Sequence, residues 1–353
     1  MKLRLLSLIA LASASLFAQA PPKIQFDTDL DFIKLPADMN FGEVLGITVN
    51  SKGHVIVLNH PGSATSGPLY GNASTQLLEF DQTGKFVREW GKGVYGLGYA
   101  HSVRFDKYDN LWVVDKGTMS VMKFNPAGRV IMNLGRREEG PDEHHYTRGG
   151  PPPVHVDGFF NGPTDVAWDS SDNMYISDGY GNSRVAKLDK HGDWIKSWGS
   201  RGKENGQFII PHNIGVDRQN NVYVADRVNR RIQVFDSEGN WQRNILIVAP
   251  YDKKRHPVLG NTPANLPDEA EPWTICITNT PTQYIYTSDA NPGRIYKMGL
   301  DGKMVGYLGE AGHEPGQFNW THAIACPSEN SLLVADMNNW RIQKLTLRPE
   351  KMK

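Results

Sequence analysis

The chain has 353 residues, of which 39% are hydrophobic, and its 35 Gly and 22 Pro suit a loop-rich β domain. Its 38 Lys and Arg residues balance 38 Asp and Glu residues, and no basic block occurs. This balance argues against nucleic acid or an anionic membrane as the partner. The two cysteines are too few for a cysteine metal cluster.

The first 20 residues have the three-part layout of a secretory signal peptide. Two basic residues are followed by an apolar run over residues 5–17 and by Ala-Gln-Ala at 18–20, the pattern of a cleavage site. An uncleaved anchor is the weaker alternative, because a membrane-spanning helix needs ~20 apolar residues. We therefore expect cleavage after Ala20, a secreted or periplasmic protein, and no membrane association afterwards.

A unit of three strand-length apolar runs recurs along the rest of the chain. In its clearest copy the runs cover 213–216, 222–225 and 232–235, and turns of Asp, Asn, Gly and Arg separate them. Six copies align, beginning at Leu45, His101, Thr164, His212, Thr274 and His322. Repetition at a period of about 40–50 residues or more, with four strands per unit, is typical of a β-propeller. We predict an all-β fold with six blades.

A fourth strand follows each of the first five copies but not the last. These runs cover residues 86–90, 130–134, 194–198, 241–247 and 304–308. An incomplete last blade would leave an open edge, which a ring must avoid. We predict that a segment near 24–26 or 32–35 completes the last blade. The single propeller then covers 21–348, and residues 349–353 form a basic tail.

The second strand of most copies ends at an Asp that leads a turn of the form D-x-x-N-x-R-I. The turns begin at Asp115, Asp178, Asp226, Asp289 and Asp336. This pattern resembles the NHL repeat family of propellers. Asp and Asn can bond to turn backbone and Arg can pair with a carboxylate, so the default role of these residues is structural.

Two long insertions and two cysteines leave alternatives open. The insertion at 136–160 contains His144, His145 and His155, and the one at 249–272 is rich in Pro, Asp and Glu. Each insertion is a candidate binding loop or a solvated surface segment. Cys276 and Cys326 can pair in an exported protein or remain free buried thiols.

Histidine occupies the first aligned position in alternate copies, at His101, His212 and His322. Alternate blades of a six-fold ring lie about 120° apart, so the three imidazoles should converge on the channel axis. Three neutral imidazoles can hold a divalent metal, and Zn²⁺ with three histidines and an open fourth position is the catalytic form of that site. The alternative is that each histidine bonds locally to backbone.

Two segments resemble peptidyl-α-hydroxyglycine α-amidating lyase. They are FNGPTDVAWDSSDNMYISDGYGNSR at 160–184 and GQFIIPHNIGVDRQNNVYVADRVNRRIQ at 206–233. The resemblance implies a six-bladed propeller in which His101, His212 and His322 hold zinc. It also implies a catalytic tyrosine at Tyr180 and an active-site arginine at Arg227.

The implied reaction cleaves a carbinolamide, R-CO-NH-CH(OH)-COO⁻, into an amide and glyoxylate. Zinc would lower the pKa of the α-hydroxyl, Tyr180 would take its proton, and Arg227 would bind the carboxylate or stabilise developing negative charge. The structural alternatives are packing of Tyr180 on a blade rim and an inter-blade salt bridge for Arg227. We expect a small-molecule or peptide substrate with a carboxylate, and a monomeric protein.

The chain departs from the family at several positions. Asn59 and His60 stand where the family has a second active-site arginine, and Gly181 stands where it has a cysteine. Thr321 and Ala323 flank the third histidine, where the family has Met and Asp. That Asp helps to hold a structural calcium ion, so the resemblance leaves calcium open here. Two further alternatives are a metal-dependent, lactonase-like propeller hydrolase and a non-catalytic NHL-type binding platform.

Overall fold

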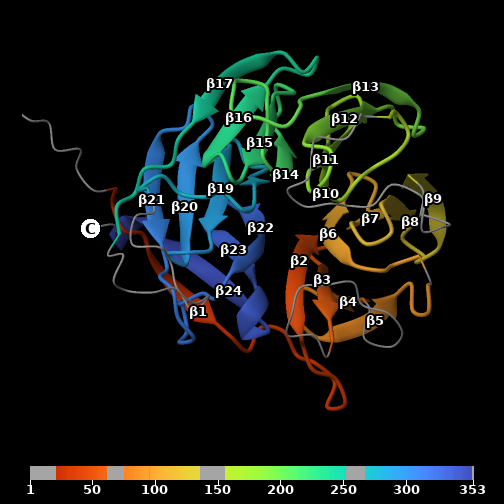
Figure 1. Ribbon diagram of the computed structural model, residues 1–353. Helices are drawn as coiled ribbons and strands as arrows, with labels where there is room; N and C mark the ends of the chain where they lie inside the picture. Colours follow the sequence, from red (N-terminus) through yellow and green to blue (C-terminus); the bar gives the residue numbers. More distant parts are fainter. Residues whose placement is uncertain (1–20, 62–74, 95, 136–155, 252–266, 352–353) are drawn as a thin grey trace, which may run out of the picture.

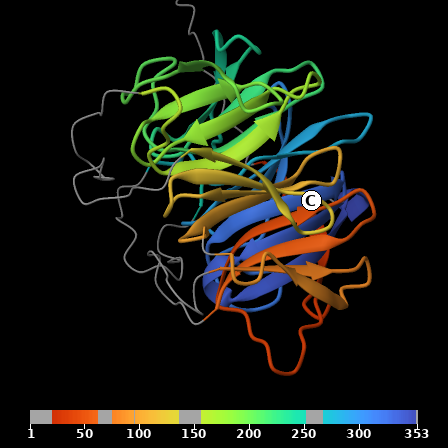
Figure 2. The ribbon, with the colours of Figure 1, turned by 90° about the vertical axis from the view of Figure 1, so that its right-hand side faces the viewer.

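The computed structural model describes residues 21–61, 75–94, 96–135, 156–251 and 267–351. They form six four-stranded antiparallel sheets, which stand as blades around a central axis (Figure 1). The view turned by 90° shows the blades as a stack of strongly twisted sheets (Figure 2). The predicted six-bladed β-propeller is confirmed. The expected signal peptide and most of both insertions, including His144, His145 and His155, lie outside the described residues.

The first three blades follow the chain in order. The first holds β2 (Glu43–Val49), β3 (Val55–His60), β4 (Gln76–Phe80) and β5 (Phe86–Trp90). The second holds β6 (Ala100–Phe105), β7 (Leu111–Asp115), β8 (Ser120–Phe124) and β9 (Val130–Gly135). The third holds β10 (Pro163–Trp168), β11 (Met174–Asp178), β12 (Arg184–Leu188) and β13 (Trp194–Trp198).

The next two blades repeat this order, and the last blade joins the two ends of the chain. The fourth holds β14 (Pro211–Val216), β15 (Val222–Asp226), β16 (Arg231–Phe235) and β17 (Trp241–Ile245). The fifth holds β18 (Cys276–Ile277), β19 (Tyr284–Asp289), β20 (Arg294–Gly299) and β21 (Met304–Leu308). The sixth holds β22 (Thr321–Ser328), β23 (Ser331–Asp336) and β24 (Arg341–Arg348), followed on its outer edge by β1 (Gln25–Asp29). Short 3₁₀ turns cover Met337–Asn339 (η2) and Pro349–Lys351 (η3).

The N-terminal strand closes the ring. β1 pairs antiparallel with β24, with Phe26 opposite Leu347, and the two strands lie side by side in red and blue in Figure 1. The first of the two predicted closing segments is therefore confirmed. The second candidate contributes differently, because Lys34 bridges to Lys85 of the first blade. The N-terminal segment thus contacts both sides of the junction.

The Asp-led turns play the structural role predicted for them. Asp226 accepts hydrogen bonds from the backbone N–H of Ile209 (2.8 Å), from Nδ2 of Asn229 (2.8 Å) and from Nε of Arg231 (2.8 Å). Asp336 makes the corresponding three bonds in the sixth blade. Both Asp residues therefore tie their turn to the segment that enters the blade, which fixes the backbone of the residue after the Asp.

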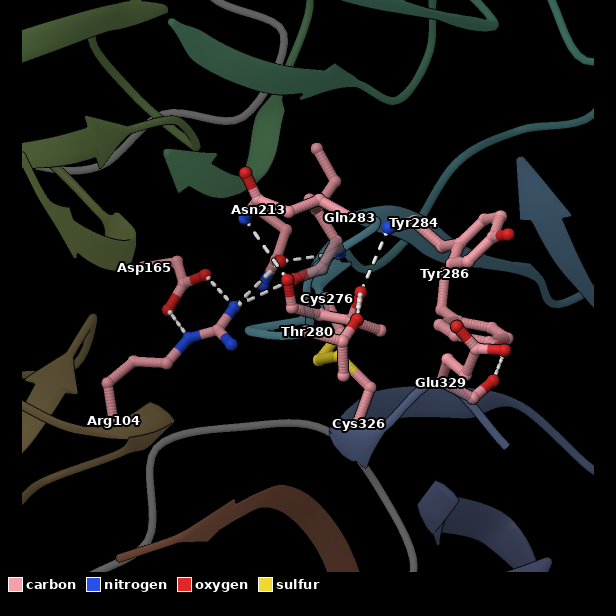
Figure 3. Close-up of a disulfide and its surroundings, with 12 residues drawn as sticks. Arg104, Asp165, Asn213, Cys276, Thr280, Gln283, Tyr284, Tyr286, Cys326 and Glu329 are labelled. Atoms are coloured by element: carbon pink, nitrogen blue, oxygen red, sulfur yellow. Dashed lines mark hydrogen bonds and ion pairs between the residues drawn. A yellow bond between two sulfur atoms is a disulfide. The ribbon is translucent and has the colours of Figure 1, made fainter. Parts of the chain in front are cut away.

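A disulfide links the fifth and sixth blades. Cys276 on β18 and Cys326 on β22 are bonded, with their Cα atoms 6.1 Å apart (Figure 3). This decides between the two alternatives that the sequence left open for the cysteines. β18 is shorter than the run predicted from Thr274, because the hydroxyl of Thr278 accepts the N–H of Tyr284 (2.9 Å) where a strand ladder would continue. The disulfide therefore reinforces the inner strand with the fewest ladder bonds.

Candidate metal centre

Three histidines from alternate blades meet in the central channel. His101 lies on β6, His212 on β14 and His322 on β22, and all three are buried. Their ligand atoms lie within 4.8 Å of one another, and the ring centroids are 4.8–5.2 Å apart. The convergence expected from their alternation along the sequence is what the structure shows. Such a cluster could hold a metal ion.

Each imidazole is oriented by a bond to the next blade. Nδ1 of His101 donates to the carbonyl of Thr164, Nδ1 of His212 to that of Trp273, and Nδ1 of His322 to that of Leu45, each at 2.7 Å. A carbonyl can only accept, so Nδ1 carries the proton and Nε2 presents its lone pair to the channel. Bonds from the histidines to backbone, the alternative that the sequence left open, are present, and they leave each Nε2 free of that bond and able to bind a metal.

Burial keeps the three imidazoles neutral. Desolvation, followed by repulsion from neighbouring groups, holds the pKa of His101 and of His212 well below the usual value of 6.5. Desolvation also lowers the pKa of His322 to about 4. The nearby positive charges that depress these pKa values belong to Lys116 and Arg227. A neutral imidazole is the form that a metal ion requires.

Tyr180 points its hydroxyl into this cluster. It follows the Asp178 turn after β11, and its Oη lies 3.1 Å from Nε2 of His101 and 3.2 Å from Nε2 of His212. One phenol proton can serve only one of these two lone pairs at a time. At least one imidazole Nε2 therefore keeps a lone pair that no proton of Tyr180 can satisfy, and such a lone pair is available to a metal cation.

Gly181, next to the tyrosine, is a departure from the resembled family that the structure explains. A Cβ atom added there would lie 2.3 Å from the Asn161 side chain, so a cysteine would require that side chain to move.

Arg227 lies near the histidines, in the blade next to that of Tyr180. It follows Asp226 at the end of β15, and its guanidinium stacks 4.1 Å from the ring of Trp273. Its Nε is 3.3 Å from a carboxylate oxygen of Glu271, so the inter-blade ion pair expected as the structural alternative is present. The side chain is nevertheless close enough to lower the pKa of all three histidines. The ion pair with Glu271 is therefore present, and an active-site role for Arg227 stays a prediction.

Three residues that lie near the histidines were not identified from the sequence: Trp273, Trp320 and Lys116. Trp273 packs edge-on against His212 at 4.8 Å and against Trp320 at 4.5 Å. Lys116 places its ammonium 4.6 Å from the centre of the Tyr180 ring. A usable signal existed for Lys116, because it follows Asp115 just as Arg227 follows Asp226.

In the first blade, the residue that follows Asn59 is a neutral histidine, His60, and not a charged side chain. His60 ends β3 where the resembled family has its second arginine, and it is fully buried against Tyr99. Desolvation lowers its pKa to about 3, so the ring is neutral above that pH.

The centre of the channel does not fit a calcium ion held as in the resembled family. Ala323 offers no side-chain oxygen. Arg104 instead reaches across the channel, where its Nη2 lies 2.6 Å from Asp165 and 3.0 Å from Asn213 (Figure 3). Within the described ranges, the histidine trio is the one group of three or more His, Cys, Asp or Glu side chains close enough to bind a metal.

The fold and the site define a class of protein: a six-bladed propeller with a three-histidine centre. The family model of the NHL repeat matches residues 208–235, within the fourth blade. The described residues contain no helix long and apolar enough to span a membrane.

The particular resemblance is to amidating lyases. The chain is 27% identical over 235 residues to a probable peptidyl-α-hydroxyglycine α-amidating lyase of Caenorhabditis elegans, covering 61% of this chain and 63% of the relative. It is 33% identical over 188 residues to peptidyl-glycine α-amidating monooxygenase A of Xenopus laevis, covering 51% of this chain and 18% of the relative. The alignments thus span less than two thirds of both relatives. The suspected likeness to amidating lyases is confirmed.

Solved structures extend the fold likeness to other chemistry. A gluconolactonase of Xanthomonas campestris has a TM-score of 0.56 and 13% identity, and the match covers 93% of this chain and 95% of that one. At this identity the likeness concerns the fold alone. The propeller is therefore compatible with several reactions, and the choice among them depends on the side chains at the centre.

Proposed function

We propose that the protein is an exported, zinc-dependent lyase that cleaves the C–N bond of an α-hydroxyglycine-type carbinolamide to an amide and glyoxylate. The observation that carries the proposal is the cluster of His101, His212 and His322, with the hydroxyl of Tyr180 at hydrogen-bond distance from Nε2 of two of them and Arg227 nearby. The names of the similar proteins from worm and frog support the same reaction class.

Zinc is the metal that suits this donor set. Three neutral imidazoles with an open fourth position are the ligands of catalytic zinc. The Nε2 atoms of His101, His212 and His322 would hold the ion, and their Nδ1 bonds to backbone would keep the rings in place. Zinc bound there would supply Lewis-acid polarisation of a substrate oxygen.

The chain's own residues would handle the proton and the carboxylate. Oη of Tyr180 would accept the proton of a substrate α-hydroxyl that enters the centre. The electron pair of the deprotonated oxygen then forms the aldehyde, the C–N bond breaks, and the amide nitrogen receives the proton. Arg227 would bind the carboxylate or the charge that develops during this step.

The disulfide supports export. Paired cysteines persist in oxidising compartments such as the periplasm or the extracellular space. Cys276 and Cys326 are paired, and the first 20 residues have the layout of a signal peptide. Both features agree with a secreted or periplasmic enzyme.

Metal analysis and a product assay test the proposal together. The mature protein should contain about one zinc ion per chain and should release glyoxylate and benzamide from α-hydroxyhippurate. If the protein contains zinc but releases no glyoxylate, the proposed metal site stands and the proposed substrate is wrong. If the protein binds no metal, both the metal site and the lyase reaction are wrong, and a non-catalytic binding platform is favoured.

A lactonase-like hydrolase is the second candidate function. The gluconolactonase fold favours it, but lactonase-type propeller sites rely on Asp, Glu and Asn ligands. The metal-binding group found among the described residues consists of histidines. Hydrolysis of a sugar lactone by the same zinc-loaded preparation, without release of glyoxylate from α-hydroxyhippurate, would reverse our preference.

A further inference from the structure

One turn position recurs in every blade, at the end of the blade's second strand. The residue after the strand-end Asp or Asn occupies it, and the six residues are His60, Lys116, Gly179, Arg227, Ala290 and Met337. His60 is buried and neutral, and three of the others are small or apolar. The position therefore provides two basic side chains besides that neutral imidazole, one in the second blade and one in the fourth.

The Lys116 turn is as firmly held as the Arg227 turn. The carboxylate of Asp115 accepts the N–H groups of Tyr99 (3.0 Å), Gly117 (2.7 Å) and Thr118 (2.9 Å). The backbone N–H of Lys116 also donates to the carbonyl of Tyr99 at 3.1 Å. The lysine side chain therefore leaves a rigid turn, which limits the entropy lost when it binds a ligand.

The ammonium of Lys116 lies between two aromatic faces. Its Nζ is 4.1 Å from the ring centre of Tyr99 and 4.6 Å from that of Tyr180. Over the described parts of the chain, it forms no ion pair with a carboxylate, whereas Arg227 has Glu271 at 3.3 Å. A half-buried cation that lies over π faces and has no carboxylate partner among the described residues can bind an anion.

Lys116 and Arg227 each contact an aromatic ring that packs against a histidine of the cluster. Lys116 contacts the ring of Tyr180, and Arg227 stacks on Trp273. Both are close enough to His101 and His322 to lower the pKa of each. The indole N–H of Trp273 is a buried donor without an acceptor among the described residues. The surroundings of the centre are thus rich in donors and positive charge.

We propose that Lys116 is an anion-binding residue of this site, which holds the carboxylate of the substrate from the Tyr180 side while Arg227 lies on the Trp273 side. The inference rests on the proposed function for the identity of the substrate. It names Lys116 as a residue that distinguishes substrates with a carboxylate next to the reacting carbon from their neutral amides and esters.

Calorimetric binding of two unreactive analogues tests the role of Lys116 without requiring turnover. Hippurate keeps the carboxylate, and hippuramide replaces it with a neutral amide. Lys116→Met should weaken hippurate binding by about 10- to 100-fold, as expected for the loss of a charge-assisted bond. The affinity for hippuramide should stay within about threefold, and Lys116→Arg should restore most of the hippurate affinity.

Lys303→Met is the matched control, because this lysine lies on an exposed turn of the fifth blade, and its side chain is 89% exposed. It should bind hippurate like the unmodified protein. Circular dichroism checks that each variant is folded. A Lys116→Met protein that is folded and binds hippurate normally would overturn the inference, as would unmodified protein that binds no hippurate.

The failure of this inference and of the proposed function can be told apart. Glyoxylate release that is unchanged in Lys116→Met would leave the lyase function standing and reject the role of Lys116. Hippurate binding that depends on Lys116, in a protein that releases no glyoxylate, would reject the lyase function and retain a carboxylate site. In an active lyase, the loss should raise KM more than it lowers kcat, because Lys116 binds the ground state as well as the transition state.

Discussion

Oη of Tyr180 and Nε2 of His212 lie 3.2 Å apart, although they come from different blades. The imidazole cannot turn away, because its Nδ1 is bonded to the carbonyl of Trp273. The phenol is held by its own turn, in which the N–H of Tyr180 donates to the carbonyl of Gly162. This pair therefore places an acid–base group directly at a candidate metal ligand.

Tyr180→Phe should remove the base and retain the metal site. We expect glyoxylate release to fall by about 10²- to 10⁴-fold, the usual contribution of a positioned acid–base group. Zinc content should not change, since the three Nε2 atoms remain. Stopped assays of glyoxylate and mass-spectrometric metal analysis measure the two quantities.

Tyr108→Phe is the control for this substitution, because Tyr108 is 60% exposed and lies on the turn between β6 and β7. It should retain full activity. Full activity in Tyr180→Phe would instead assign Tyr180 to packing alone.

His212→Ala should abolish stoichiometric metal binding. Removal of one of three ligands leaves two imidazoles, and the carbonyl of Trp273 loses its donor, at a cost of about 1–3 kcal/mol. A chelator should lower the melting temperature of the unmodified protein, because a ligand bound only to the folded state stabilises it. The same chelator should leave the melting temperature of the variant unchanged.

His191→Ala provides the matched comparison, since His191 is exposed on a turn of the third blade. Its metal content and its response to the chelator should equal those of the unmodified protein. A variant His212→Ala that still holds one zinc per chain would contradict the three-histidine site.

The buried His60 should lower the free energy of unfolding as the pH falls below 6.5. Burial lowers its folded-state pKa from 6.5 to about 3, so between these pH values the unfolded chain binds a proton that the folded chain does not. Stability is therefore fully present above pH 6.5 and is lost as the pH falls toward 3, by about 2–4 kcal/mol.

Urea unfolding of His60→Leu at several pH values checks this contribution. The variant should lose less stability than the unmodified protein between pH 6.5 and pH 4. Equal losses in both proteins would show that other groups cause the acid sensitivity.

The Arg104–Asp165 pair should stabilise the channel as a unit. Arg104→Met leaves a fully buried carboxylate without its partner, which should lower the free energy of unfolding by about 3–5 kcal/mol. The double variant Arg104→Met/Asp165→Asn should recover part of that loss, because the uncompensated charge is gone. Denaturant unfolding of the two single variants and the double variant provides the coupling energy, and additive losses would contradict a coupled pair.

The repeat pattern alone predicted much of this protein. Six repeated apolar units, five of them with Asp-led turns, predicted six blades, since each unit can bury its apolar face only against a neighbour. The alternation of His101, His212 and His322 predicted their meeting at the axis, because equivalent positions of a closed ring share one level. The closing strand followed from the need to pair the edge of the last blade, although the sequence offered two candidate segments.

Other features depend on contacts between distant segments. The pairing of Cys276 with Cys326 needed the geometry of two adjacent inner strands, which no spacing reveals. Arg104 pairs with Asp165, a residue 61 positions away on the neighbouring blade, so the sequence did not reveal this contact. Lys116 stood in a recognisable turn, but only the packed structure shows its ammonium over the ring of Tyr180. Local pattern determines strands and turns, whereas the direction and charge environment of a side chain are decided by the blades that pack around it.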